Sequence, residues 1–141
     1  MDNKELKKVF CAIAKQYGFR TAFGCCYKES SECLLVLELQ KSNYSNLFYL
    51  NLKTYIQGVF GKKYMGNVFN RPPSEYSSIF DLENNMSDEK RLRMLHAFFN
   101  EFIVPYSEKN LSVAGIRELA NTEEILLIST IEEELNRLYP L

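Results

Sequence analysis

Apolar residues recur at the spacing of one helical face over the first 17 residues of the chain. That face collects Leu6, Val9, Phe10, Ile13, Ala14 and Tyr17. Asp2 followed by Glu5 is typical of a helix N-terminus, and Gly18 suits the left-handed position that often follows a helix. The pattern therefore predicts a helix over residues 3–17.

Three runs with the two-residue period of β-strands follow, over residues 19–28, 33–41 and 47–57. In the third run, one side carries apolar residues and the other side carries Tyr49, Asn51, Lys53 and Tyr55. In the first run, the same alternation predicts that Phe23 and Cys25 share a side. The connections between the runs are short, which predicts an antiparallel meander.

The next stretch, residues 58–87, is rich in glycine and contains two consecutive prolines, Pro72 and Pro73. Residues 75–82 have the pattern of a fourth strand at the edge of the sheet. Residues 58–71 are expected to form a loop that folds over the sheet. Long loops often carry function, so this segment is one candidate place for a site.

Helical periodicity returns after Ser87, which is a favourable N-cap for a helix over residues 88–104. Pro105 is expected to end or kink that helix. Two further helices are predicted, a short one near residues 112–120 and a last one over residues 122–138. This order of elements predicts an α+β fold: an N-terminal helix, an antiparallel sheet of three or four strands, and C-terminal helices packed on one sheet face.

Composition supports an ordinary globular protein. The chain has 141 residues, of which 46% are hydrophobic and 25% are charged, so residues 1–141 are expected to form a single α+β domain. No apolar run is long enough for a membrane span. The charged N-terminus lacks the apolar segment of a secretory signal, which favours a cytoplasmic location.

The net charge of −1 hides an asymmetry between the two halves of the chain. Residues 1–71 carry 11 Lys and Arg against 5 Asp and Glu, whereas residues 72–141 carry 6 against 13. Residues 41–71 contain no acidic residue at all. Two interpretations are open: the halves attract each other within the domain or in a homodimer, or the basic half faces an acidic partner.

Motifs of known chemistry are scarce. The four cysteines, Cys11, Cys25, Cys26 and Cys33, form no CxxC motif, and adjacent residues of a strand point to opposite faces. We expect buried thiols that act as small hydrophobes, without disulfides in a reducing cytoplasm. The single histidine, His96, lies among apolar residues of a predicted helix, where a structural role is expected. No catalytic residue, metal site or cofactor is predicted.

The most suggestive group of side chains lies on the polar side of the third predicted strand. Tyr49, Asn51, Lys53 and Tyr55 project together there, and Glu38 and Gln40 of the neighbouring strand are expected beside them. Tyrosines among lysine and amide groups are typical of protein recognition surfaces. Two other interpretations stay open: single-stranded nucleic acid, and a half-exposed sheet face without a partner. The predicted binding residues are Lys41, Asn51, Lys53, Tyr55, Lys62 and Lys63.

Two short motifs resemble a known family. Residues 39–45 (LQKSNYS) and 48–52 (FYLNL) follow a helix that ends in Gly18-Phe19. In these features the chain resembles a family of small bacterial proteins known only as domain-of-unknown-function family 4304, most strongly over residues 5–57. The resemblance implies an α+β domain in the bacterial cytoplasm. It supplies no catalytic residues, because the family has no assigned activity.

The sequence thus favours a non-enzymatic protein-binding module, immunity-like or regulatory, with an acidic protein as its partner. The alternative is a small-ligand-binding protein or an enzyme with a pocket between the sheet face and residues 58–82. Nucleic acid and membrane are not expected as partners. The oligomeric state does not follow from the sequence, and a homodimer is left open.

Overall fold

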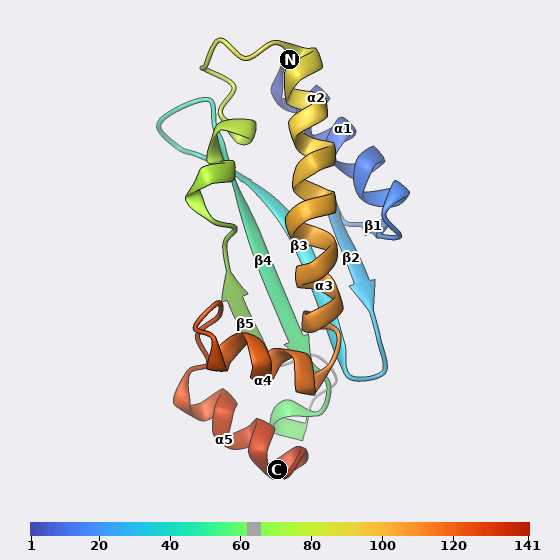
Figure 1. Cartoon of the computed structure of the whole chain (residues 1–141), viewed down its shortest axis with the longest axis vertical. Helices are drawn as coiled ribbons and strands as arrows, with labels where there is room; N and C mark the ends of the chain where they lie inside the picture. Colours follow the sequence, from blue (N-terminus) through green and yellow to red (C-terminus); the bar gives the residue numbers. More distant parts are fainter. Residues whose placement is uncertain (62–65) are drawn as a thin grey trace.

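A computed structural model describes residues 1–61 and 66–141 and shows a sheet with helices against one face (Figure 1). Helix α1 (Asn3–Gln16) comes first, followed by five strands: β1 (Arg20–Ala22), β2 (Cys25–Glu29), β3 (Cys33–Lys41), β4 (Phe48–Ile56) and β5 (Gly66–Asn70). Two short 3₁₀ helices flank β5: η1 (Val59–Gly61) and η2 (Ser74–Phe80). The C-terminal part is helical: α2 (Asp88–Phe98), the π-helical η3 (Phe99–Ile103), α3 (Val104–Asn110), α4 (Val113–Asn121) and α5 (Ser129–Leu138). The predicted α+β fold is confirmed.

The strands follow one another in the sheet in sequence order, and every neighbouring pair is antiparallel. The meander is thus confirmed, with five strands in place of the predicted three or four. β3 and β4 form the centre, where Leu37 lies opposite Leu52 and Glu38 lies opposite Asn51. The alternation therefore sends the apolar side of β4 toward the helices and its polar side away from them.

One extra strand arises because the first predicted run is a hairpin. Phe23 and Gly24 both have positive φ, 52° and 76°, and separate β1 from β2. Positive φ at both central residues is the signature of a tight type I′ turn. The prediction that Phe23 shares a strand face with Cys25 was therefore wrong, and the Phe23 side chain lies in solvent.

The other extra strand lies in the segment between residues 58 and 82. Residues 66–70, predicted as part of a loop over the sheet, form β5 and extend the sheet beside β4. The predicted edge strand at residues 75–82 was wrong, because Ser74–Phe80 is the 3₁₀ helix η2. Ile79 and Phe80 are buried there, so η2 packs into the core.

The helix after the sheet begins as predicted, since the Ser87 side chain accepts a hydrogen bond from the Lys90 N–H at 3.2 Å. It does not end at Pro105, however, but runs on to Asn110 through the π-helical turn η3. Proline has no N–H to donate and its ring crowds the carbonyl four residues earlier. The wider π turn just before Pro105 accommodates both effects without ending the helix.

The last helix is shorter than predicted. Residues 122–138 were expected to be helical throughout, but α4 ends at Asn121 and α5 begins at Ser129. Glu123 adopts φ 61°, a left-handed conformation that no right-handed helix contains. The predicted helix near residues 112–120 is confirmed as α4.

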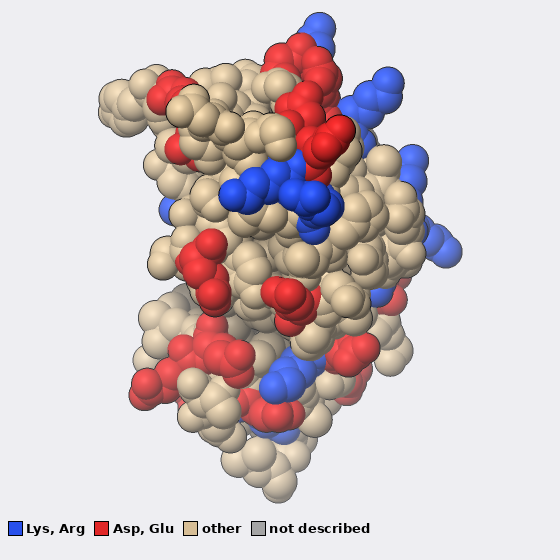
Figure 2. Space-filling view, turned by 45° about the horizontal axis from the view of Figure 1, so that its top comes forward, with Lys and Arg blue, Asp and Glu red and all other residues tan. Residues whose placement is uncertain are grey.

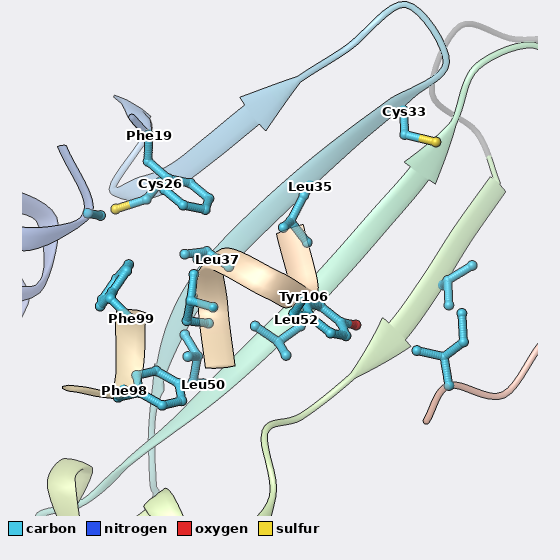
Figure 3. Packing of buried hydrophobic residues seen from close by; sticks show 14 of the residues in the cluster. Phe19, Cys26, Cys33, Leu35, Leu37, Leu50, Leu52, Phe98, Phe99 and Tyr106 are labelled. Atoms are coloured by element: carbon cyan, nitrogen blue, oxygen red, sulfur yellow. The ribbon is translucent and has the colours of Figure 1, made fainter. Parts of the chain in front are cut away.

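The core fills the space between the sheet and the helices (Figure 3). Leu35 and Leu37 of β3 and Leu50 and Leu52 of β4 are buried against aromatic side chains of the helical layer. α1 and the C-terminal helices share this core, to which four buried residues contribute: Phe10, Ile13, Phe99 and Leu135.

A buried arginine ties η2 to α2. Arg91 is only 2% exposed, and its guanidinium donates hydrogen bonds to the carbonyls of Ile79 at 2.6 Å and Asp81 at 3.1 Å, and to Asn84 Oδ1 at 2.9 Å. These carbonyls end the 3₁₀ helix and would otherwise be buried without donors. Burial lowers the pKa of Arg91 from its usual value.

Candidate interaction surface on the open sheet face

The face of the sheet turned away from the helices carries the polar side chains of β3 and β4. Within the described residues, no helix packs on this face, and its aromatic side chains are accessible to solvent. Tyr49 is 41% exposed and Phe69 of β5 is 49% exposed, whereas the opposite side of the same strands is buried. We call this surface, made of Glu38, Gln40, Tyr49, Asn51, Lys53, Tyr55, Phe69 and Arg71, the open face.

Asn51 lies at the centre of the open face. Its Nδ2 donates to Glu38 Oε1 at 3.0 Å and to Gln40 Oε1 at 2.8 Å, and its Oδ1 accepts from Arg71 Nε at 3.1 Å. All the polar atoms of the Asn51 side chain are thus engaged, although it is only 3% exposed. Asn51 therefore positions its neighbours and is itself covered by them.

Glu38 and Lys53 form the charged pair of this network. Lys53 Nζ lies 3.2 Å from Glu38 Oε2, and both side chains are partly exposed. The hydrogen bond from Asn51, followed by the charge of Lys53, lowers the pKa of Glu38 below its usual value. The carboxylate therefore stays ionised near neutral pH, and its charge is compensated by that of Lys53.

Arg71 is the cation that the network leaves most available. Its guanidinium carbon lies 4.6 Å from the centroid of the Tyr49 ring and 5.6 Å from that of Phe69. Nε is held by Asn51, and the residue is exposed. The planar fork is therefore held by two rings and one hydrogen bond in a residue that remains exposed.

A small hollow lies at the rim of the open face beside Arg71. It has a volume of about 110 Å³ and is bordered by Tyr49, Pro72, Pro73 and Tyr76. The hollow forms beyond the end of β5. β5 leaves the first half of β4 uncovered, because the pairing between the two strands ends at Leu52. The size of the hollow is that of a single aliphatic side chain.

The structure brings three of the predicted binding residues together and separates a fourth. Asn51, Lys53 and Tyr55 share the open face, although Asn51 lies beneath the surface. Lys41 has the parity of the inward residues of β3, and its Nζ donates to the carbonyls of Ser42 at 3.0 Å and Ser45 at 2.8 Å. Lys62 and Lys63 lie outside the described residues.

Sequence reasoning missed Arg71 and Phe69 as members of the site. The segment that contains them was interpreted as a loop, which hides the alternation of Val68, buried at 2%, with Phe69. The available signals were this alternation and the position of Arg71 at the end of an acid-free stretch.

Other candidate groups are less organised. His96 is half-buried on α2, with its ring centroid 6.3 Å from that of Tyr17. In the part of the chain that the structure describes, no group of three or more His, Cys, Asp or Glu is placed to hold a metal ion. Over residues 1–61 and 66–141, no helix is both long and apolar enough to cross a membrane.

The fold and the open face define an α+β protein with a meander sheet covered on one side. A protein-family model described as "Domain of unknown function (DUF4304)" matches residues 10–109, and the chain belongs to this family. The resemblance carried by residues 39–52 is thereby confirmed. Neither the curated proteins nor the solved structures contain a match to the chain.

Proposed function

We propose that this protein is a non-enzymatic binding module of the cytoplasm that takes an acidic segment of a partner protein on its open face. The observation that carries the proposal is the fixed and exposed guanidinium of Arg71. An arginine fork matches the two oxygens of a carboxylate, and such charge-assisted pairs are among the strongest hydrogen bonds in proteins.

The surroundings of Arg71 reduce the cost of binding. A free arginine side chain loses rotamer freedom when it engages a ligand, at about 0.5–1.5 kcal/mol for each side chain ordered. The rings of Tyr49 and Phe69 and the hydrogen bond from Arg71 to Asn51 have already ordered it. Exposed tyrosine and arginine are also the residue types that dominate protein interfaces.

The distribution of charge favours an acidic partner at this place. Figure 2 shows Asp and Glu over the end of the molecule where α4 and α5 lie and also at the opposite end, with Lys and Arg beside them. The Lys53–Glu38 pair lies inside the basic half of the chain and the Lys109–Glu118 pair lies inside the acidic half, whereas the pair of the Met1 amino group with Asp88 joins the two halves. On the open face, Arg71 attracts an acidic segment, because the charge of Lys53 is already paired with that of Glu38.

The hollow beside Arg71 favours a partner segment that also carries an apolar side chain. A partner carboxylate on Arg71 would place the neighbouring residue of an extended chain within reach of this hollow of about 110 Å³. We therefore propose a partner segment in which an acidic residue stands next to an aliphatic one.

Binding of two matched peptides tests this function. One labelled peptide alternates Glu and Leu, and the other carries Gln in place of each Glu. We expect the acidic peptide to bind at least tenfold more tightly by fluorescence anisotropy, with an affinity that falls as salt rises. Amide shifts in an NMR titration should be confined to β4, β5 and the residues around Arg71.

Variants of the protein locate the contact. Arg71→Ala should lower the affinity for the acidic peptide roughly 10–100-fold, which corresponds to the loss of one charge-assisted bidentate contact. Arg71→Lys keeps the charge but removes the two-pronged donor group, so its affinity for the acidic peptide should be nearly as low as that of Arg71→Ala. Arg93→Ala removes an exposed arginine of α2 and should change affinity less than twofold.

Several results would contradict the proposal. Equal affinity of Arg71→Ala and wild type would move the site elsewhere, and Lys53→Ala combined with Tyr55→Ala then tests the rest of the open face. If the Glu and Gln peptides bind equally well, or if neither peptide binds, the proposal of an acidic partner is contradicted. Tighter binding of a single-stranded oligonucleotide, with shifts on the same strands, would replace the protein partner by nucleic acid.

A further inference from the structure

Two cysteines from different elements meet beneath the hairpin of β1 and β2. Cys26 Sγ donates a hydrogen bond to Cys11 Sγ at 3.4 Å, which joins β2 to α1. Figure 3 shows the Cys26 sulfur pointing away from the sheet, toward α1. Cys26 is buried, whereas Cys11 is partly exposed on the helix. Both thiols are free.

We propose that Cys11 is an oxidation site for hydroperoxides, and that Cys26 then closes a disulfide with it. The bridge would link α1 to β2 across a separation of 15 residues. This site is independent of the open face, because adjacent residues of β2 point to opposite sides of the sheet and Cys26 lies on the helical side.

The chemistry divides between the two sulfurs. The Cys11 thiolate attacks one peroxide oxygen, the O–O bond breaks, and the other oxygen leaves as an alcohol or water after it takes up a proton. Cys11 becomes a sulfenic acid, oxidised by two electrons. The Cys26 sulfur then attacks the Cys11 sulfur, an S–S bond forms, and the hydroxyl leaves as water with the proton of the Cys26 thiol.

The surroundings suit each sulfur to its step. The hydrogen bond from Cys26, together with the charge of Lys15 one turn further along α1, lowers the pKa of Cys11 to about 7. The same hydrogen bond and burial raise the pKa of Cys26. Near neutral pH, Cys11 is therefore the sulfur that attacks the peroxide as a thiolate. Cys26 stays protonated and gives up its proton in the second step.

The other two cysteines lack this arrangement. Cys25 lies on the far side of β2 from Cys26, where burial and the charge of Glu38 raise its pKa. Cys33 is fully buried at the end of β3, and burial raises its pKa to about 12. Since the pKa of Cys11 is lowered while those of Cys25 and Cys33 are raised, Cys11 holds the largest share of thiolate at pH 7 and should oxidise before either of them.

Peptide mapping after mild oxidation tests the site. The reduced protein is treated with a small excess of hydrogen peroxide at pH 7, the remaining thiols are alkylated, and the digest is examined by mass spectrometry. We expect one main product, a peptide pair joining Cys11 to Cys26 with the loss of two hydrogen atoms. A reductant should reverse it, and the oxidised monomer should melt at a higher temperature than the reduced one.

Single variants separate the two steps. Cys26→Ala should accumulate a Cys11 sulfenic acid that dimedone traps, whereas Cys11→Ser should abolish the bridge. Cys25→Ser is the matched control, since it changes the next residue of the same strand and should leave the bridge intact. A bridge that involves Cys25 or Cys33, a bridge between two chains, or no thiol loss at Cys11 in the wild-type protein would overturn the proposal.

Discussion

The two faces of the sheet are built from the same strands but by opposite principles. On the inner face, most residues of β3 and β4 are apolar and buried, and the one buried polar side chain there, Thr54, is paired with Asn110 at 2.8 Å. On the open face, charges, amides and rings form a network around Asn51. The inner face thus supplies most of the free energy of folding, and the open face contributes little to it.

Truncating a ring of the helical layer that packs on the inner face is expected to have the largest effect. Phe99 is fully buried and its ring lies 5.3 Å from that of Phe10 and 5.4 Å from that of Tyr17. Phe99→Ala should lower the free energy of unfolding by about 3–5 kcal/mol, because it removes apolar contacts and leaves a cavity. Urea unfolding measures this change.

Tyr49→Ala is the control on the open face, since it also removes one ring. Because Tyr49 is 41% exposed, Tyr49→Ala should lower the free energy of unfolding by less than about 1 kcal/mol. The same change should weaken binding of the acidic peptide. Equal losses of stability from Phe99→Ala and Tyr49→Ala would erase the contrast between the two faces.

Arg91 tests whether a buried charge can stabilise the helical layer that covers the inner face. Arg91→Met keeps the bulk of the side chain but leaves the carbonyls of Ile79 and Asp81 without their donor. We expect a loss of about 2–4 kcal/mol in the free energy of unfolding, with protection from hydrogen exchange lost first in η2. Arg93→Met, at an exposed position of the same helix, should change stability by less than about 0.5 kcal/mol.

The two central strands were predictable because each is a run of nine residues: β3 is strongly apolar, and β4 alternates between apolar and polar residues. That alternation alone places Asn51, Lys53 and Tyr55 on one face. The same rule assigns Lys41 to the side of Leu39, whereas its place among the predicted binding residues rests on its charge.

The parts that escaped prediction depend on pairing or on unusual backbone conformations. β5 has five residues and is stabilised by β4, so its own pattern is too short to identify it. Phe23 and Glu123 adopt left-handed conformations that are unfavourable for such residues, which hides the turn after β1 and the end of α4. Arg71 became part of the site only because β5 carries it beside Tyr49.

The smallest expected effect concerns the ion pair of the open face and its dependence on pH. The native pKa of Glu38 is lowered, so at acidic pH the unfolded chain binds its proton more readily than the folded protein does. The stabilisation is therefore complete above the usual glutamate pKa, 4.5, and is lost as the pH falls through the lower native pKa.

A double-mutant cycle of Glu38→Gln and Lys53→Met measures this contribution. Since both side chains are partly exposed, we expect a coupling of only about 0.5 kcal/mol at pH 7, from urea unfolding. It should shrink toward zero when the same cycle is repeated at a pH well below 4, while the cost of Phe99→Ala stays in place. A coupling that persists or grows in acid would mean that the Glu38 carboxylate does not hold the network, and that Gln40 and Asn51 organise the open face by themselves.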